Sequence, residues 1–164
     1  MVRRVFFSFH YEKDSVRASQ VRNSSVTKPD LETAGYVDAA DWEEIKKGGD
    51  KAIKKWIAEN LKNTSVTAVL IGTETSNRDW VTYEIKESYN RGNGMLGIYI
   101  HNCKDFNGQT CAKGENPFGN LYITDEYGNK TYLSELYPTY DWVYNDGYNN
   151  FGDWVEEAAK AAGR

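Results

Sequence analysis

Two side chains that could do chemistry follow an apolar segment near the middle of the chain. Residues 66–71 are mostly β-branched or apolar and end at Gly72, which is typical of a strand covered on both faces. A polar crossing then leads into a helix that carries Trp80 and Glu84. Because an α-helix turns about 100° per residue, these two side chains share a face near the start of the helix. A carboxylate there could hold a ribose hydroxyl or stabilise an oxocarbenium-like cation.

The alternative for Glu84 is an ordinary solvated glutamate that pairs with a lysine. Its position favours the functional interpretation, because open α/β sheets bind ligands at the carboxyl ends of their strands. Glu87 has the same chemistry but is rotated by about 300° around the helix, so we expect it to be solvated. Ser76 is predicted to cap this helix, with Asp79 as its capping-box partner.

An aromatic group leaves the first predicted strand, residues 4–10, as Phe9, His10 and Tyr11. Phe9 could complete the core while the other two lie on the surface. Alternatively, the group forms a π platform for a nucleobase, where stacking contributes roughly 1 to 3 kcal/mol per base. Trp42 could likewise belong to the core or contact a substrate, and a core position is favoured for it.

The alternation of strands and helices predicts an α/β protein with a mostly parallel, five-stranded sheet flanked by helices. The expected strands are 4–10, 35–38, 66–71, 95–100 and 141–144. The expected helices are 15–23, 50–61, one that ends near 91–92, and 150–162. Asp50 is the expected N-cap of the second helix. The third helix should turn Val81, Ile85 and Tyr89 inward, and the last should have Ala162 on its apolar stripe. Residues 26–31 are expected to be a loop, 39–49 a loop or short helix, and 121–137 to hold a hairpin around 126–129.

A long insertion is predicted after the fourth strand. Residues 102–120 are rich in Gly and Asn, show no helical or strand period, and should lie at the same sheet edge as Glu84. Cys103 and Cys111 fall in this segment and are expected to be free thiols. With His101 they offer only three scattered metal ligands, so no metal site is predicted.

Composition and charge limit the class of protein. The 164 residues, 40% hydrophobic and 14% aromatic, fit a single domain spanning 1–164. A formal net charge of −4 gives no basic footprint for nucleic acid. No apolar run is long enough to cross a membrane, and the N-terminus lacks signal-peptide features, so a cytoplasmic protein without membrane contact is expected.

Several motifs together carry a family resemblance. They are VFFSFHY at 5–11, VTAVLIG at 66–72, and S-x-x-x-W-x-x-x-E at Ser76, Trp80 and Glu84, with NPF at 116–118 and DWVYNDGYNNFGDWV at 141–155. This pattern resembles TIR domains, and among them the TIR-like subunits of the bacterial Thoeris anti-phage systems. The resemblance implies a flavodoxin-like sheet in which the exits of strands one and three adjoin, so that Phe9 and Glu84 would face one cleft.

The same resemblance implies an activity. Catalytic TIR domains cleave the nicotinamide glycosidic bond of NAD with the glutamate that matches Glu84, and Thoeris members release a cyclic ADP-ribose-like signal that activates a partner effector. NAD is then a substrate, no cofactor is needed, and a phage-derived trigger and self-association are further expectations. Residues 38–49 lack a recognisable BB-loop motif, which leaves substrate gating and self-association open.

The candidate site follows from these residues. Glu84 is the catalytic candidate. The substrate-binding candidates are Phe9, His10, Tyr11, Asp38, Trp42, Thr73, Trp80 and Asn116. The rival interpretation is a non-catalytic TIR adaptor in which Glu84 is structural.

Overall fold

A five-stranded sheet forms the centre of the computed structural model, which describes residues 2–26 and 28–164. The strand order is β2-β1-β3-β4-β7, and every neighbouring pair is parallel. The strands are β1 (Arg3–Ser8), β2 (Leu31–Ala34), β3 (Val66–Ile71), β4 (Gly94–Tyr99) and β7 (Thr139–Asp141). The predicted α/β, flavodoxin-like fold class is therefore confirmed.

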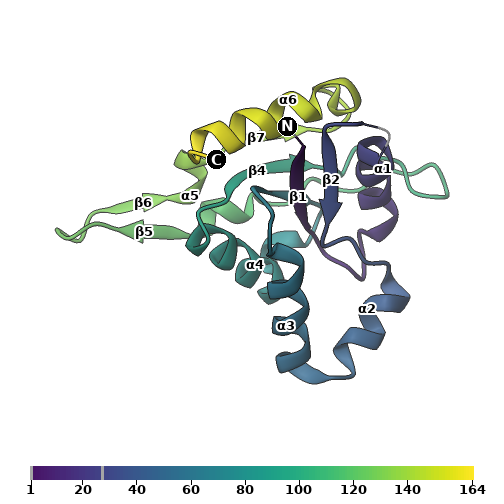
Figure 1. Cartoon of the computed structure of the whole chain (residues 1–164). Coiled ribbons are helices and arrows are strands. Elements are labelled where there is room, and N and C mark those ends of the chain that lie inside the picture. The colour runs from purple at the N-terminus through teal and green to yellow at the C-terminus, as the bar shows by residue number, and fades with distance from the viewer. Residues whose placement is uncertain (1, 27) are drawn as a thin grey trace.

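Helices cover both faces of the sheet, as Figure 1 shows with α6 along one side and α4 along the other. The helix α1 contacts α6, whereas α4 contacts β1, β3 and β4. The helices are α1 (Ser15–Val26), α2 (Ala39–Lys46), α3 (Gly49–Leu61), α4 (Asp79–Asn90), α5 (Leu133–Leu136) and α6 (Gly147–Ala161). This double cover explains why all six residues of β3 are buried.

The first strand divides its side chains between the two layers. Phe7 stacks on Phe151 of α6 with ring centroids 6.0 Å apart, and Phe6 approaches Trp56 of α3 at 6.5 Å. Since side chains alternate along a strand, Ser8 faces the same layer as Phe6, where α3 and α4 lie. The chain passes from β1 to β2 on one side of the sheet and then to β3 on the other side of β1. The carboxyl ends of β1 and β3 therefore form a topological switch point.

The second strand differs from its prediction. It occupies residues 31–34, not 35–38, because Gly35 has a φ of +77° and ends it. A Cβ at Gly35 would also lie 2.7 Å from the Phe6 ring. Within the predicted loop 26–31, Val26 still belongs to α1, Leu31 opens β2, and Thr27 lies outside the described residues.

Two predicted helix caps are wrong. The helix α3 begins at Gly49 with Gly48 as N-cap, and Asp50 lies in its first turn. A short 3-10 helix, η1 (Thr75–Asn77), takes up Ser76, and α4 then starts at Asp79 after Arg78. The Thr75 hydroxyl instead accepts a hydrogen bond from the Gly72 amide at 2.8 Å, which fixes the turn that leaves β3. The predicted end of α4 near 91–92 is confirmed.

Several element ends also shift. The first strand stops at Ser8, not His10, and the last strand is 139–141, not 141–144. Tyr89 is 36% exposed because the last turn of α4 projects beside the hairpin, and Ala162 is an exposed C-cap. The predictions that Tyr89 and Ala162 face the core are therefore wrong.

An antiparallel hairpin extends from the body of the protein, as predicted (Figure 1). Its strands are β5 (Tyr122–Thr124) and β6 (Lys130–Tyr132), and it follows a second 3-10 helix, η2 (Pro117–Asn120). Residues 102–116 before η2 contain no helix or strand, which confirms the irregular insertion.

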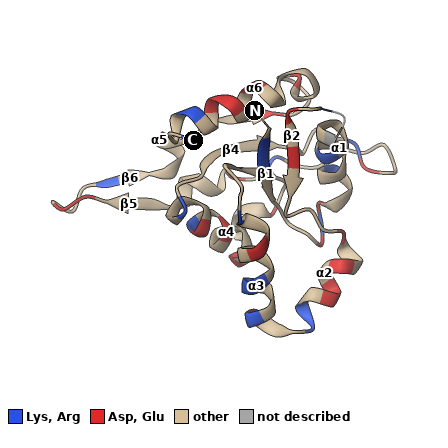
Figure 2. Cartoon of the chain, viewed as in Figure 1, with Lys and Arg blue, Asp and Glu red and all other residues tan. Residues whose placement is uncertain are grey.

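Charged side chains of both signs lie on two neighbouring helices. Figure 2 shows mostly acidic residues on α2 and both basic and acidic residues on α3. Among the described residues, no helix is both long and apolar enough to cross a bilayer.

Candidate active site

Glu84 is completely buried, although its helix begins at the ligand edge of the sheet. Its Oε1 atom accepts a hydrogen bond from the Ser8 hydroxyl at 2.7 Å, and its Oε2 atom accepts one from the Tyr11 hydroxyl. Both donors come from the end of β1 or the turn after it. Two hydroxyl groups of the chain thus occupy both oxygens of the carboxylate.

Burial dominates the electrostatics of this group. It raises the pKa of Glu84 to about 8, while the hydrogen bonds from Tyr11 and Ser8 oppose the shift. Burial and the neighbouring Glu84 also raise the pKa of Tyr11 well above its ordinary value.

An aromatic cluster surrounds Tyr11. Its ring centroid lies 4.5 Å from that of Phe9, 4.6 Å from that of Trp42 and 5.5 Å from that of Trp56. Tyr36 stacks on Phe9, with ring centroids 5.9 Å apart. Phe9 is 1% exposed and Trp42 is fully buried, so in this structure neither ring offers an open face to a base. The core position favoured for Trp42 is confirmed, and stacking of a base on Phe9 stays a prediction.

His10 and Asp38 make local contacts. The His10 Nδ1 atom accepts a hydrogen bond from the Lys13 amide at 3.2 Å, and burial is the main cause that lowers the pKa of His10. Asp38 is the N-cap of α2 and accepts a hydrogen bond from the Asp41 amide at 2.8 Å. Both residues shape turns beside the aromatic cluster.

Three further candidates have local partners as well. Trp80 is half-buried and packs edge-on against Tyr83 at 5.5 Å. The Thr73 hydroxyl donates to the Ala112 carbonyl at 2.5 Å, and Asn116 caps η2 through a 3.0 Å bond from the Phe118 amide. The structure therefore brings Tyr11 directly to Glu84, places Phe9 and Trp42 one ring further away, and uses the other candidates in turns and packing.

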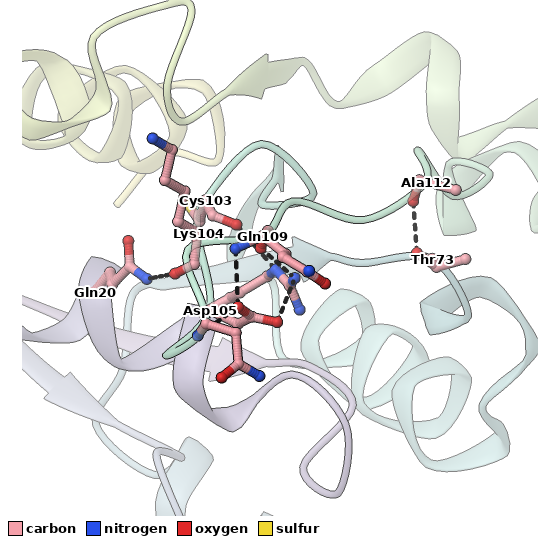
Figure 3. A network of polar contacts seen from close by, with 9 residues as sticks. Gln20, Thr73, Cys103, Lys104, Asp105, Gln109 and Ala112 are labelled. Atoms are coloured by element: carbon pink, nitrogen blue, oxygen red, sulfur yellow. Dashed lines mark hydrogen bonds and ion pairs between the residues drawn. The ribbon is translucent and has the colours of Figure 1, made fainter.

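The insertion lies along the carboxyl edge of the sheet, as predicted, and side chains from elsewhere bind its backbone. Arg17 of α1 donates to the carbonyls of Cys103 and Gln109, both at 3.0 Å, and Gln20 donates to the carbonyl of Lys104 at 2.6 Å. Figure 3 shows the Gln20 contact with Lys104 at one end of the segment and the Thr73 contact with Ala112 at the other. We call residues 102–116 the strap.

A close approach of two backbones joins the strap to the end of β3. A Cβ added to Gly114 would lie 2.0 Å from the carbonyl oxygen of Gly72, so only glycine allows this contact. Asp14 lies under the same turn, and burial raises its pKa to about 6. The strap is thus fixed to the loop between β3 and η1, the loop that leads to the helix of Glu84.

Sequence reasoning missed Ser8, Tyr36 and Trp56. Ser8 gave a usable signal, because it is the one hydroxyl in the otherwise apolar run 5–9, and a buried hydroxyl requires a hydrogen-bond partner. Trp56 lies on the apolar stripe of α3, but nothing in that stripe indicates a contact with Tyr11.

The cysteines and possible metal ligands can be placed directly. Cys103 is buried and Cys111 half-buried, both are free thiols, and burial raises the pKa of Cys103 to about 12. No cluster of three or more His, Cys, Asp or Glu side chains suited to a metal ion occurs within residues 2–26 and 28–164. The expected absence of a metal site stays a prediction.

The fold and site define the class of protein. A five-stranded parallel sheet, with an acidic helix residue packed against the switch point, is the arrangement of a TIR-like domain. Residues 6–105 match the family described as "Thoeris protein ThsB, TIR-like domain", and this range contains Ser8, Tyr11 and Glu84. The chain therefore belongs to the ThsB TIR-like family.

A curated relative supports this assignment over nearly the whole chain. The protein named "Putative cyclic ADP-D-ribose synthase ThsB1" from Bacillus cereus (strain MSX-D12) is 42% identical over 191 aligned positions. The alignment covers 94% of this chain and 100% of the relative. The similarity thus extends beyond the segment that the family match covers.

Proposed function

We propose that this protein cleaves the bond between nicotinamide and ribose in NAD and closes the remainder into a cyclic ADP-ribose. The observation that carries the proposal is the similarity, over 94% of this chain, to the relative named "Putative cyclic ADP-D-ribose synthase ThsB1". The geometry of Glu84 supports it, because this carboxylate already accepts two hydroxyl groups. A ribose presents two such hydroxyl groups side by side.

The reaction requires little proton transfer at the leaving group. When the bond from ribose C1′ to the nicotinamide nitrogen breaks, its electron pair stays on nicotinamide and neutralises the positive ring. The ribose keeps an oxocarbenium-like charge, which an ionised Glu84 would stabilise. Attack by a nucleophilic atom of the ADP moiety, followed by loss of a proton, gives the cyclic product. Attack by water gives ADP-ribose, so exclusion of water favours cyclisation.

The other candidate residues have proposed supporting roles. Phe9 and Trp80 would shape the pocket, with His10, Tyr11, Asp38, Trp42, Thr73 and Asn116 as further substrate-binding candidates. The product would act as a diffusible signal on an effector protein in anti-phage defence, with a phage-derived trigger upstream. We place this activity in the cytoplasm, where NAD is present.

Two glutamates on one helix provide the test. Glu84→Gln keeps size and removes the charge, so NAD consumption by the purified protein should fall by roughly 10² to 10⁴, the range for loss of one positioned catalytic group. Glu87→Gln is the matched control and should change the rate by less than about threefold, since its half-buried side chain is outside the Glu84 contacts. Equal rates in the two folded variants would refute the role of Glu84.

A second candidate function rests on the burial of Glu84. A carboxyl group that is 0% exposed and whose pKa is raised to about 8 can serve as a structural acid in a non-catalytic adaptor. In that case neither the wild type nor the two variants would consume NAD, and Glu84→Gln would change only the stability of the protein.

A further inference from the structure

Glu84 is not accessible to a substrate in this structure. Ser8 donates to Oε1 at 2.7 Å, Tyr11 donates to Oε2, and the glutamate is 0% exposed. A ribose hydroxyl can reach the carboxylate only if part of the cover over Glu84, such as Tyr11, moves away. The proposed reaction therefore requires a second conformation.

The two donors differ in their freedom to move. Ser8 is the last residue of β1, and strand pairing holds it opposite Val69 of β3. Tyr11 follows the strand, in the turn that the 2.9 Å bond from the Asp14 amide to the His10 carbonyl closes. Strand pairing keeps the backbone of Ser8 beside Glu84, whereas a rotation of Tyr11 would carry its hydroxyl away from Glu84 without breaking any strand pairing.

Side-chain packing from α2 and α3 keeps Tyr11 inward. Trp42 of α2 and Trp56 of α3 contact the Tyr11 ring at 4.6 and 5.5 Å. Trp42 is the only buried residue within α2, and its Nε1 atom donates to Glu12 at 3.3 Å. Glu12 also pairs with Lys46 at 3.2 Å and with Arg78 at 2.9 Å.

Few buried side chains anchor α2 over the site. Trp42 is its one buried side chain, Ile45 is partly buried against the core, and the ion pair between Lys46 and Glu12 is partly exposed, a kind of pair that contributes little to stability. Elements with few buried contacts open locally at lower free energy than the core. Movement of α2 would withdraw Trp42 and give Tyr11 space to rotate.

We propose that Tyr11 is a positioning residue that holds the enzyme in a closed state, with its hydroxyl occupying the place on Glu84 Oε2 that a ribose hydroxyl of the nucleotide takes in the open state. This inference rests on the proposed function and adds a means of regulation to the same site. Opening exposes Glu84 to water and substrate, which favours the ionised carboxylate that the reaction needs. Ser8 remains in place and orients the glutamate in both states.

Tyr11→Phe tests this proposal because it keeps the ring and removes only the hydroxyl. The closed state loses one hydrogen bond to a carboxyl group, so the open state should gain roughly tenfold in population. We expect roughly tenfold faster NAD consumption at low NAD concentration, and roughly tenfold faster amide hydrogen exchange in α2. Tyr36→Phe is the matched control, since Tyr36 stacks on Phe9 in the same cluster and is not a donor to Glu84. It should change both quantities by less than about twofold.

The outcomes separate this proposal from the proposed function. In the double variant Tyr11→Phe, Glu84→Gln the gain in activity should disappear while fast exchange in α2 remains. Unchanged exchange in folded Tyr11→Phe, or NAD consumption no faster than wild type while Glu84→Gln is inactive, would overturn the closed-state role of Tyr11. Full activity of the single variant Glu84→Gln would instead overturn the proposed function.

Discussion

The carboxyl edge of the sheet contains two polar regions that are built in different ways. Around Glu84, side-chain hydroxyls satisfy a buried carboxyl group whose ionisation burial opposes. Along the strap, Arg17, Gln20 and Thr73 donate to backbone carbonyls. Burial of the Glu84 carboxyl group costs free energy, and opening of the site would remove that cost. The hydrogen bonds along the strap stabilise the folded state only while the strap stays in place. We therefore expect the Glu84 region to move when the site opens and the strap to keep its position.

The largest expected effect concerns the pH dependence of stability. The pKa of Glu84 is about 8 in the folded protein, against 4.5 for the ordinary group. The folded state therefore keeps a proton that the unfolded state releases, so this contribution to stability is present below about pH 4.5 and is lost as pH rises to about 8. At about 1.4 kcal/mol per pKa unit, the loss should reach roughly 3 kcal/mol, allowing for partial relaxation.

Urea unfolding of wild type and Glu84→Gln at pH 5.5, 7 and 8.5 checks this sign. The variant should become more stable relative to wild type as pH rises, and Glu87→Gln should show no such trend. A constant difference across this range would mean that Glu84 is already ionised in the folded protein. The Glu84 region would then not differ from the strap in the way described above, because burial would not prevent the ionisation of its carboxyl group.

The strap should respond to the loss of Arg17. Arg17→Met removes the donors to two carbonyls and the 3.7 Å ion pair with Asp105, so unfolding should require about 2 kcal/mol less free energy. Amide exchange should quicken in the strap but not in α2. Gln20→Ala, which removes one exposed contact to the Lys104 carbonyl, should cost less than half as much. Faster exchange in α2 after Arg17→Met would show that the two regions are coupled.

The smallest expected effect is at Phe9. Phe9→Leu roughly conserves volume in a buried position, so the stability loss should be about 1 kcal/mol. If Phe9 also meets the substrate in the open state, the Michaelis constant for NAD should rise severalfold because the π face is lost. Steady-state kinetics decide the point, and an unchanged Michaelis constant in the folded variant would assign Phe9 to the core alone.

Local pattern and tertiary contact explain what the sequence could predict. The apolar run of β3 and the spacing of Trp80 and Glu84 predicted the strand, the helix and their place in the sheet, because these depend on near neighbours. The donors to Glu84 lie 76 and 73 residues away in the chain, so no local pattern could reveal them.

The same distinction applies to the second strand and the strap. Gly35 adopts a positive φ and ends β2, a backbone choice that the apolar pattern of 35–38 did not show. The strap was predicted as an irregular insertion, but its attachment depends on Arg17 and Gln20 of a helix with a weak apolar stripe. Side chains that bind distant carbonyls leave no periodic signal in the sequence.

The central claim, that this protein makes a cyclic ADP-ribose from NAD through Glu84, is tested most directly in cells. Small-molecule extracts of bacteria that express wild type, Glu84→Gln or Glu87→Gln at equal levels, with and without phage infection, would be compared by mass spectrometry. We predict a cyclic ADP-ribose product in infected cells with wild type and Glu87→Gln, and none with Glu84→Gln. The same amount of product with Glu84→Gln, or no product with wild type, would contradict the account.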